Sequence, residues 1–398
     1  MIRFQEAFAA VMNSVTPLNT VEVDLDKAYG GVLAEGVISD IDIPPFDKSA
    51  MDGYAVHALD LRSVPVSLPV HKTIAAGSAV TGEAEGGSCV RIMTGAPVPR
   101  GFDAVVMFEE TEELEGKVRF VRGAHSGQNI CRRGEDIEKG KRVLEQGSII
   151  RGPEIAVLAS VGRTSVRIFR KPLVSILSTG SEIVEPGQPL RYGMIRNSNG
   201  PMLRSLVASS GAEVTYLGIG ADRDRELSSL VEQGLHGDML LISGGVSMGD
   251  YDLIPDILRK TGADIKLHRV KIKPGKPLLL AKRDACVIIG IPGNPVSNFT
   301  TFHLFIKPAL HRMMGRSDNA LHFMEGRADV SIHKTGERAQ LMPSVYRVVD
   351  GVFVVKPLKL NGSADIVGCA GCNCLLFLEE GDQRVAEGGR VSIVLVDS

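Results

Sequence analysis

The strongest constraint on the fold is a regular alternation of strand and helix patterns in the second half of the chain. Short apolar runs such as Leu173–Leu177 and Met239–Ile242 have the length of buried strands, and amphipathic segments such as Met202–Ser209 separate such runs. Repeated βαβ units build an open sheet with helices on both faces. We therefore predict an α/β fold with a mostly parallel central sheet in residues 171–315. Further predicted strands are Glu213–Leu217, Ile265–Lys271, Leu278–Ala281 and Cys286–Ile289, and further predicted helices are Arg225–Leu235, Leu253–Lys260 and Pro295–Met314.

The remaining residues are predicted to form two β-rich domains and one connecting module. Residues 46–135 contain short alternating runs broken by glycine and proline, which indicates an inserted β domain. Residues 316–398 return to short strands separated by polar turns and are predicted to form a C-terminal domain like a β-barrel. Residues 1–45 and 136–170 flank the insert, and we predict that they form one linker module with an amphipathic N-terminal helix.

Composition narrows the class of protein. The 398 residues exceed what one core usually holds, so several domains are expected. Lysine and arginine number 45 against 47 acids, and a net charge of −2 lacks the broad basic field of a general nucleic-acid binder. No apolar run is long enough to span a bilayer, and the amino terminus does not resemble a signal peptide. We therefore expect a cytoplasmic protein without membrane or nucleic-acid partners.

Polar and glycine-rich segments follow the predicted strands of the central domain. In open α/β sheets ligands bind beyond the carboxyl ends of the strands, so these segments are expected to meet at one edge. Their candidate site residues are Ser178, Thr179, Gly180, Glu182, Asp222, Gly244, Gly245, Ser247, Asp250, Asp252, Lys273, Lys276, Pro292, Gly293, Asn294 and Ser297.

The chemistry of these segments favours a phosphate and magnesium site. Glycine turns let backbone N–H groups approach an anion, and the helix that starts after Pro295 adds partial positive charge. Lys273 and Lys276 can place two cations against a second anion. Each feature also has a purely structural interpretation, as a helix cap, a turn or a surface charge. The oxygen ligands that suit Mg²⁺ are Glu182, Asp222, Asp250 and Asp252.

Two other patterns allow different chemistry. Gly245 to Gly249 fits the G-x-S-x-G pattern of a serine hydrolase with Ser247 as nucleophile, but an acidic loop follows and no histidine is marked as the base. The second pattern consists of three clustered cysteines, Cys369, Cys372 and Cys374. They suit either a metal or redox site or small buried residues, and no fourth ligand is marked nearby.

Several short motifs, taken in order, resemble the molybdopterin molybdenumtransferases, the family of MoeA and the gephyrin E domain. The resemblance covers nearly the whole chain. The motifs are Ser49-Ala50-Met51-Asp52-Gly53-Tyr54-Ala55, Thr94-Gly95-Ala96, Arg133-Gly134-Glu135-Asp136, Ser178-Thr179-Gly180, Gly244-Gly245-Val246-Ser247-Met248-Gly249, Lys273-Pro274-Gly275-Lys276-Pro277 and Pro292-Gly293-Asn294-Pro295-Val296-Ser297.

The resemblance implies insertion of molybdate, or of tungstate, into adenylylated molybdopterin with Mg²⁺-dependent loss of AMP. It implies catalytic roles for Asp52, Asp252, Lys273 and Lys276, with Asp252 as the essential acid. It implies that Lys273, Lys276, Ser247 and Ser297 hold molybdate or the pterin phosphate. The other residues expected to bind substrate are Thr94, Ser178, Thr179, Gly180, Gly244, Gly245, Pro292, Gly293, Asn294 and Ser363.

The resemblance also implies an elongated homodimer in which Asp52 and Thr94 complete the partner's site. Contacts with the adenylyltransferase and with enzymes that accept the cofactor are further expectations. Two alternatives stay open: a molybdopterin adenylyltransferase, which would consume ATP instead of releasing AMP, and a non-catalytic scaffold or storage protein of the same family.

The C-terminal domain departs from the family pattern. Where relatives place an arginine in a G-R-x-x-F-x-R-like run, this chain has Met342, and Arg338 or Arg347 are the candidate substitutes. The usual serine is present as Ser363, but Asp365 follows it closely, where an acid near molybdate is unexpected. These differences bear on oxyanion affinity and on the choice between molybdate and tungstate.

Overall fold

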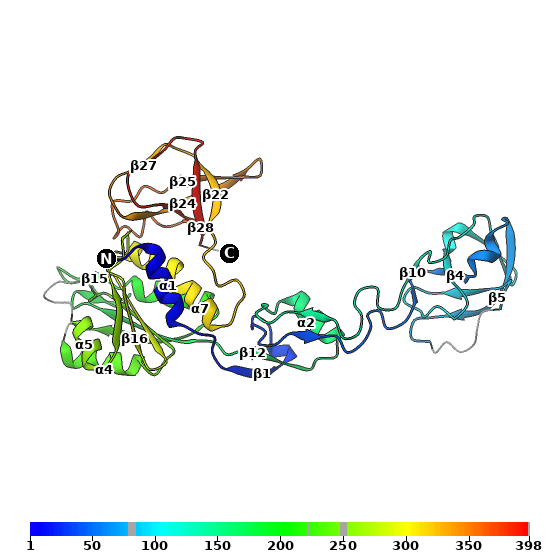
Figure 1. The fold of residues 1–398 in the computed structure, drawn as a ribbon, viewed down its shortest axis with the longest axis horizontal. Coiled ribbons are helices and arrows are strands. Elements are labelled where there is room, and N and C mark those ends of the chain that lie inside the picture. Colours follow the sequence, from blue (N-terminus) through cyan, green and yellow to red (C-terminus); the bar gives the residue numbers. More distant parts are fainter. Residues whose placement is uncertain (79–84, 222, 247–252, 397–398) are drawn as a thin grey trace.

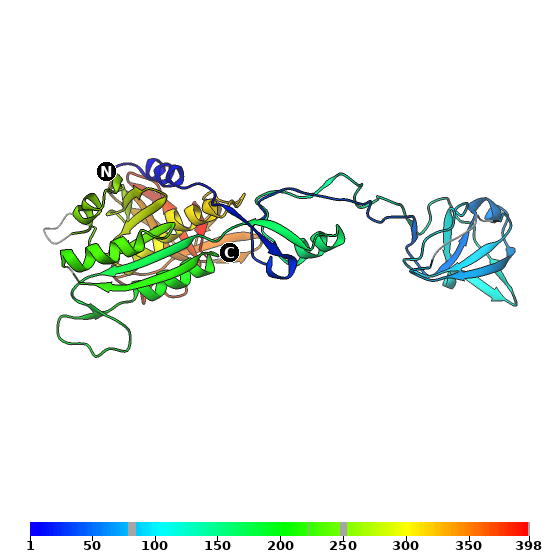
Figure 2. The same ribbon diagram turned by 90° about the horizontal axis from the view of Figure 1, so that it is seen from below.

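The chain folds into an elongated molecule in which the linker module separates the inserted domain from the other two domains (Figures 1 and 2). The computed structural model describes residues 1–78, 85–221, 223–246 and 253–396. The α/β domain and the C-terminal barrel form one end, where both termini also lie, and the inserted β domain forms the other. No helix within these ranges is long and apolar enough to cross a membrane.

The central domain contains the open, mostly parallel sheet that the sequence predicts. The strand order is β16-β13-β17-β21-β20-β18. The first four strands are parallel, β20 is antiparallel to β21, and β18 is antiparallel to β20. The chain order reverses between β13 and β17, and such a reversal opens a crevice for ligands at the carboxyl edge. The strands are β13 (Leu173–Thr179), β16 (Glu213–Gly220), β17 (Met239–Ser243), β18 (Asp264–His268), β20 (Leu279–Arg283) and β21 (Cys286–Ile291).

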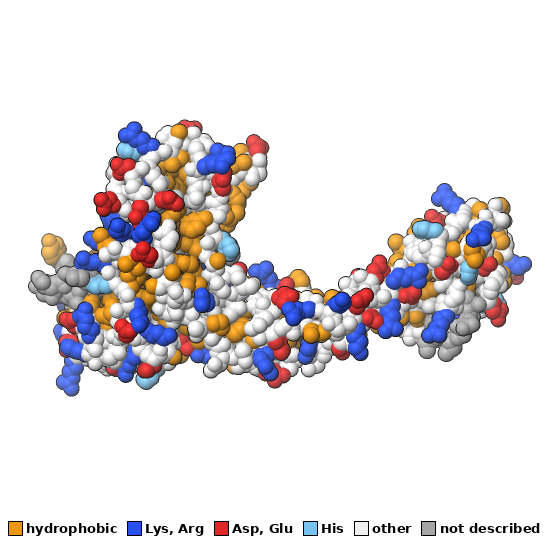
Figure 3. All heavy atoms as spheres, in the orientation of Figure 1, with side chains coloured by type: hydrophobic (Ala, Val, Ile, Leu, Met, Phe, Trp, Pro, Cys, Tyr) orange, Lys and Arg blue, Asp and Glu red, His pale blue; other side chains and the backbone are white. Residues whose placement is uncertain are grey.

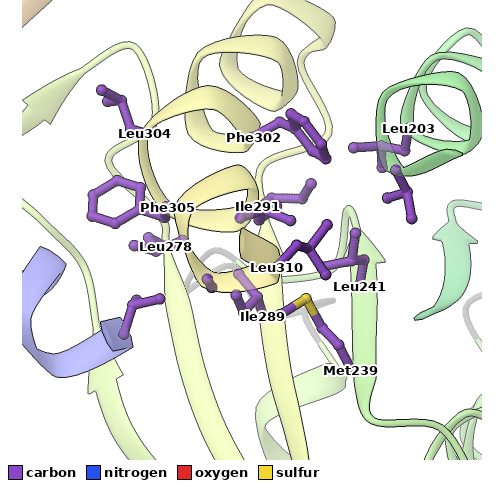
Figure 4. Close-up of a cluster of buried hydrophobic side chains, with 14 of the residues drawn as sticks. Leu203, Met239, Leu241, Leu278, Ile289, Ile291, Phe302, Leu304, Phe305 and Leu310 are labelled. Atoms are coloured by element: carbon purple, nitrogen blue, oxygen red, sulfur yellow. The ribbon is translucent and has the colours of Figure 1, made fainter. Parts of the chain in front are cut away.

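Helices cover both faces of this sheet because successive strand residues point to opposite sides. Ile176 packs in one core with α1 (Phe4–Ser14), α3 (Asn199–Ser209) and α7 (Lys307–Met313). Figure 4 shows part of this core, including Leu203 and Leu310. Leu177, the neighbour of Ile176 in the sequence, packs in the opposite core. The helices on that second face are α4 (Asp224–Gly234) and α5 (Ile254–Lys260).

The structure corrects three details of the prediction. Strand β18 ends at His268 and not at Lys271, because Arg269 has a φ of +81° that interrupts the extended ladder. The predicted helix Pro295–Met314 consists of α6 (Pro295–Thr301), a π-helical turn (Phe302–Ile306) and α7. Pro308 lacks the N–H that a regular α-helix needs, and the wider turn before it accommodates its ring.

The third correction concerns the N-terminal helix, which the sequence pattern places in the linker module. It packs on the central domain instead: the ring of Phe4 lies 5.6 Å from that of Phe305, and Ala7 and Val11 are fully buried in the same core. The apolar face of α1 is complementary to the long helix that ends the domain. The helix therefore begins the chain in one domain before the chain enters the next.

The linker module consists of short two-stranded pairs and one helix. It contains β1 (Thr20–Asp24), η1 (Leu25–Lys27), β2 (Val37–Ile38), β3 (Lys48–Ser49), β10 (Ile130–Cys131), β11 (Arg142–Leu144), α2 (Gly152–Ser160) and β12 (Ser165–Phe169). Beyond it, the inserted domain has a sheet of order β7-β4-β6-β5-β9-β8 around the buried rings of Tyr54 and Phe120. Its elements are β4 (Gly53–Val56), η2 (Ala58–Leu61), β5 (Val66–Ile74), β6 (Cys89–Ile92), β7 (Ala104–Met107), η3 (Phe108–Glu110), β8 (Thr111–Leu114) and β9 (Lys117–Phe120).

The C-terminal domain is a closed barrel, because β24 pairs with both β25 and β26. The order around the barrel is β24-β25-β22-β28-β26. The barrel strands are β22 (Met324–Ala328), β24 (Ala339–Val349), β25 (Val352–Pro357), β26 (Cys374–Leu378) and β28 (Arg390–Leu395), and a separate pair consists of β23 (Ile332–Lys334) and β27 (Gln383–Val385). A short pair, β14 (Ile183–Val184) and β15 (Ile195–Arg196), precedes α3 in the central domain.

Charged side chains are mixed over the visible surface. On the face in Figure 3, basic and acidic groups alternate along all parts of the molecule. This distribution agrees with the near-neutral net charge of −2. Any strong anion site must therefore be local.

Candidate active site

A cavity of about 480 Å³ lies where the central domain meets the barrel. The loop between β18 and β20, the start of α6, the start of β24 and the loop after β25 all contribute to its wall. The structure thus brings together site residues that are far apart in the sequence. The predicted residues in its lining are Lys273, Lys276, Pro292, Asn294, Ser297 and Ser363, and Gln340 is one that the sequence analysis did not identify.

The lining of this cavity is positively charged. Lys273, Lys276 and Arg338 contribute cationic groups, and none of the described aspartates and glutamates lines the cavity. Among the residues that the structure describes, none of these three side chains forms an ion pair. The walls also include apolar side chains, which lower the local dielectric and strengthen charge interactions. The cavity is therefore suited to an anion.

The two lysines flank a bend that depends on Gly275. This glycine has a φ of +109°, and a Cβ there would approach Ile272 Cδ1 to 2.8 Å. Immediately before the bend, β19 (Ile272–Lys273) pairs in parallel with β24, and Lys273 lies opposite Gln340. Lys273 thus belongs to the sheet of the barrel, although in the sequence it lies between β18 and β20 of the central sheet.

A second contact joins the two domains beside α6. Asn294 Nδ2 donates to Ser363 Oγ at 2.7 Å, and the N–H of Val296 donates to the Ser363 carbonyl at 3.1 Å. The sequence predicts that the helix N-terminus faces an anion, but the Val296 N–H is already bonded within the chain. Ser297 lines the cavity and is only 3% exposed.

The cavity distinguishes between the two candidate arginines. Met342 lines it at the position where the resemblance predicts an arginine. Arg338 lines the same cavity, and its Nη1 donates to the Ile272 carbonyl at 3.4 Å. Arg347 instead pairs with Asp329 at 2.9 Å. Arg338 is therefore the arginine that can meet an anion here.

Asp365, the unexpected acid, does not line the cavity. Its carboxylate accepts hydrogen bonds from the backbone N–H groups of Asn361 at 3.0 Å and Gly368 at 2.9 Å. These N–H groups hold the pKa of Asp365 below its usual value. The acid stabilises the loop that carries Ser363, and its negative charge is directed at the backbone.

The turns after three parallel strands meet at the carboxyl edge of the central sheet. The N–H of Gly244 donates to the Ile291 carbonyl at 3.0 Å, and its Cα lies 3.8 Å from the position of a Cβ on Gly293. Thr179 Oγ1 donates to the Ser243 carbonyl at 3.4 Å. The convergence expected from the sequence therefore holds for the turns that follow β13, β17 and β21.

Ser178 and Gly180 also make internal hydrogen bonds at this edge. Asn197 Nδ2 donates to Ser178 Oγ at 3.2 Å and to the Tyr216 hydroxyl at 2.8 Å, and that hydroxyl donates to Glu185 at 2.5 Å. Burial and the Glu185 carboxylate raise the pKa of Tyr216 above its usual value. The Gly180 N–H donates to the Gly220 carbonyl at 3.2 Å. In this structure these groups shape the edge.

Asn199 is a candidate that sequence reasoning missed. It is the first residue of α3, and its Nδ2 donates to Ser243 Oγ at 2.9 Å and to the Gly293 carbonyl at 2.7 Å. Its Oδ1 is buried and has no hydrogen-bond partner among the described residues. Buried acceptors normally have partners, so this oxygen is suited to accept an N–H from a ligand. A polar residue at the start of the helix after β13 was the available signal.

Only one of the four predicted magnesium ligands can be located. Asp222, Asp250 and Asp252 lie outside the described residues, as does Ser247. Glu182 is exposed, and its Oε2 lies 2.7 Å from the position of a Cβ on Gly180, so its carboxylate is at the sheet edge. The described part of the chain contains no group of three metal-ligating side chains. Magnesium binding therefore stays a prediction.

Asp52 and Thr94 lie together at the other end of the molecule. The Thr94 N–H and hydroxyl donate to Asp52 Oδ1 at 2.6 and 2.8 Å. These two hydrogen bonds lower the pKa of Asp52. Both residues belong to the inserted domain, which is separated from the central sheet in two perpendicular views (Figures 1 and 2). The pair does not contribute to the cavity of its own chain.

The three clustered cysteines are buried. Cys372 Sγ donates to the Cys374 carbonyl at 3.1 Å, and burial raises the pKa of Cys374 to about 12. The neighbouring Cys372 thiol and burial raise the pKa of Cys369 as well. Both Cys369 and Cys374 are therefore neutral thiols at physiological pH, which are poor metal ligands and nucleophiles. Their position fits the interpretation as small core residues.

Replacing Gly244 by Ala is expected to distort the sheet edge. Gly244 has a φ of +96°, and an added Cβ would lie 2.7 Å from the Thr179 carbonyl oxygen. We expect the free energy of unfolding of the central domain to fall by about 1–3 kcal/mol more than in the control Gly187→Ala. Gly187 also has a positive φ, of +92°, but nothing within 4 Å of an added Cβ. Chemical denaturation measures both variants, and equal losses would contradict the proposed clash.

Comparisons with known proteins find relatives that match this chain along its whole length. Residues 2–162 match the MoeA N-terminal region (domain I and II), residues 175–312 a probable molybdopterin binding domain, and residues 325–396 the MoeA C-terminal region (domain IV). Proteins named molybdopterin molybdenumtransferase from Staphylococcus aureus and Staphylococcus epidermidis are each 33% identical over 402 residues, covering 100% of this chain and 96% of theirs.

Solved structures give the same result. A molybdopterin biosynthesis MoeA protein from Pyrococcus horikoshii has a TM-score of 0.84 and 30% identity, with 100% of both chains covered. A molybdenum cofactor biosynthesis protein from Pyrococcus furiosus shares the fold, with a TM-score of 0.62, 20% identity and 99% of both chains covered. This full-length similarity argues against the interpretation of the chain as a serine hydrolase. The chain belongs to the MoeA family of molybdopterin molybdenumtransferases, enzymes of molybdenum cofactor biosynthesis.

Proposed function

We propose that this chain inserts molybdate into adenylylated molybdopterin and releases AMP in a Mg²⁺-dependent reaction. The observation that carries the proposal is the cavity between the central domain and the barrel. Within the described part of the chain, its lining has three cationic side chains and no acid, and it adjoins the carboxyl edge of an α/β sheet through Pro292 and Asn294. One part of the site is suited to a small oxyanion, and the adjoining part to a nucleotide-like ligand.

Lys273, Lys276 and Arg338 would bind the molybdate. A tetrahedral dianion needs more than one cation in a partly apolar cavity, and these side chains approach from both domains. Ser297 and Ser363 add hydroxyl groups at the wall. With Met342 in place of the family's arginine, Arg338 supplies the guanidinium from a position four residues earlier.

The pterin nucleotide would lie along the sheet edge. The turns contain Gly180, Gly244 and Gly245. Because glycine has no side chain, a ligand can approach the backbone closely there. Asn199 Oδ1 offers an acceptor without a partner among the described residues, which suits an amino group of a heterocycle. This part of the site would orient the phosphoanhydride toward the lysines.

Magnesium fits the donor chemistry at this edge. Glu182 provides one carboxylate, and Asp222, Asp250 and Asp252 follow neighbouring strands in the sequence. Bound there, Mg²⁺ would neutralise charge on the phosphoanhydride. The lysines would stabilise the charge that develops when a molybdate oxygen or a water attacks the phosphate and AMP leaves. The dithiolene sulfurs of the pterin would then take the molybdenum, without a covalent enzyme intermediate.

A second copy of the chain would complete the site. Asp52 and Thr94 are held together in the inserted domain, far from the cavity of their own chain (Figure 1). An elongated homodimer would place this pair beside the partner's cavity. The proposal therefore includes a shared site, with Asp52 ionised at neutral pH.

The test is AMP release from adenylylated molybdopterin by the purified protein with Mg²⁺, in the presence and absence of molybdate or tungstate. We expect release that depends on one of the two oxyanions and stops when Mg²⁺ is chelated. Consumption of ATP with free molybdopterin would indicate the adenylyltransferase instead. Absence of AMP despite bound substrate would contradict the proposal and favour the scaffold function.

A further inference from the structure

A hydrogen-bond network lies at the start of α3, where that helix meets the carboxyl edge of the central sheet. Its centre is Asn197, which is only 3% exposed. Asn197 Nδ2 donates to Ser178 Oγ at 3.2 Å and to the Tyr216 hydroxyl at 2.8 Å. Asn197 Oδ1 accepts the N–H of Gly200 at 3.0 Å. The network therefore connects the end of β13, the edge strand β16 and the first turn of α3, and none of its residues lines the cavity between the two domains.

Tyr216 attaches the network to the edge strand. Its hydroxyl accepts from Asn197 and donates to Glu185 Oε1 at 2.5 Å. The Arg204 guanidinium, one turn further along α3, lies 5.2 Å from the centre of the Tyr216 ring. A Cβ on Gly200 would lie 2.9 Å from the same hydroxyl, so a larger residue there would displace it. Tyr216 thus contacts both the first turn of α3 and the turn that follows.

The Tyr216 hydroxyl keeps its hydrogen over the physiological pH range. Burial and the Glu185 carboxylate raise the pKa of Tyr216 above its usual value. The hydroxyl is therefore a constant donor to Glu185, and its oxygen is left as the acceptor for Asn197. The Asn197 amide has one orientation as well, since its Nδ2 faces two oxygens and its Oδ1 faces an N–H. The directions of the hydrogen bonds from Asn197 to Glu185 are thus fixed.

Asn199 is the residue that this arrangement positions. It lies in the sequence between Asn197 and Gly200, which the network holds in place. Its Nδ2 donates to Ser243 Oγ at 2.9 Å and to the Gly293 carbonyl at 2.7 Å, at the ends of β17 and β21. Both amide hydrogens are used in this way, and the buried Oδ1 has no partner among the described residues. A ligand N–H at the sheet edge would supply this partner.

We propose that Tyr216 and Asn197 are positioning residues for the pterin nucleotide. They hold the first turn of α3 so that Asn199 Oδ1 accepts an N–H of the bound heterocycle. This inference rests on the proposed function, because it takes the pterin nucleotide as the ligand of the sheet edge. Tyr216 and Asn197 do not touch the ligand themselves, and their effect passes through Asn199. Loss of either one weakens ligand binding.

Equilibrium titration of the full chain with adenylylated molybdopterin tests the proposal, with Mg²⁺ present and both oxyanions omitted to prevent AMP release. We expect Tyr216→Phe to weaken binding about tenfold, as for the loss of one buried hydrogen bond. Asn199→Ala removes the acceptor itself and is expected to weaken binding by at least as much. In the double variant, Tyr216→Phe is expected to add less than about twofold to the loss in Asn199→Ala, because the tyrosine acts through that amide.

Two control variants separate positioning from other effects. Tyr346→Phe removes a hydroxyl of the same kind from the barrel, where Tyr346 packs against Phe353, and we expect binding within about twofold of the unchanged chain. Glu185→Gln keeps an acceptor for Tyr216 without the charge, and we expect binding within about threefold. Hydrogen exchange of the Gly200 N–H is a second readout, and it is expected to become faster in Tyr216→Phe but not in Tyr346→Phe.

The titrations distinguish a failure of this inference from a failure of the proposed function. Equal binding by the unchanged chain and by Tyr216→Phe would overturn the inference and leave the proposed function intact. Fully additive losses in the double variant would also overturn it, because Tyr216 would then act independently of Asn199. Absence of binding by the unchanged chain would contradict the proposed function, and this inference with it.

Discussion

Replacing Lys276 by Gln is expected to reduce molybdate-dependent AMP release by about 100- to 1,000-fold, the usual cost of removing one group that stabilises developing charge. Lys276 lines the cavity, and no described residue neutralises it. If it stabilises charge mainly in the transition state, the loss appears in kcat; if it mainly binds molybdate, the loss appears in KM for molybdate. Steady-state measurements over a range of molybdate concentrations separate the two.

The matched control for this prediction is Lys271→Gln. Lys271 lies in the same loop but does not line the cavity, so its loss removes the same charge from the same region. We expect AMP release by this control within about twofold of the unchanged protein, as for surface substitutions remote from a site. Equal losses in the two variants would show that the overall charge of the loop matters, and not the cavity.

Replacing Phe305 by Ala is expected to cost about 3–5 kcal/mol of unfolding free energy in the central domain. Its ring is fully buried and contacts Phe4 edge-on, and Figure 4 shows the side chain projecting from the long helix. Truncation leaves a cavity between α1, the π-helical turn and the sheet. Because the chain has several domains, the central-domain transition must be followed separately, for example by hydrogen exchange in β17 and β21.

Phe46→Ala is the control for this second prediction. Phe46 is the same residue type but is 43% exposed, in the segment that leads to the inserted domain. We expect its truncation to cost less than about 1 kcal/mol, because little buried apolar area is lost. A similarly small loss for Phe305→Ala would mean that the α1 interface collapses to fill the space.

Much of the central domain could be predicted because its strands are buried on both faces. Leu173–Leu177 and Met239–Ile242 are nearly continuous apolar runs, which are typical of buried parallel strands. The sequence did not predict those features that depend on pairing between distant parts of the chain. Ile272–Lys273 is too short to show a strand pattern, and its partner in the barrel is far away in the sequence. The attachment of α1 likewise depends on a complementary surface, which its own amphipathic pattern does not identify.

In the candidate site, too, local features were predictable from the sequence, and features that depend on tertiary contacts were not. The glycine turns at Gly180 and Gly244 were predictable, because the rule that ligands bind at strand ends needs only the order of strands and turns. Arg338 could not be chosen over Arg347 from the sequence, since only the closed barrel shows which of them lines the cavity. Asn199 was missed because its importance lies in contacts with two other strand ends.

The pairing of β19 with β24 has a mechanical consequence. Lys273 moves with the barrel, whereas Asn294 and Ser297 belong to the long helix of the central domain. Any rotation of the barrel against that helix therefore changes the spacing between the lysine and the opposite wall, and it also stretches the Asn294–Ser363 contact. Such a rotation would therefore widen the cavity and separate its cationic and polar walls at the same time.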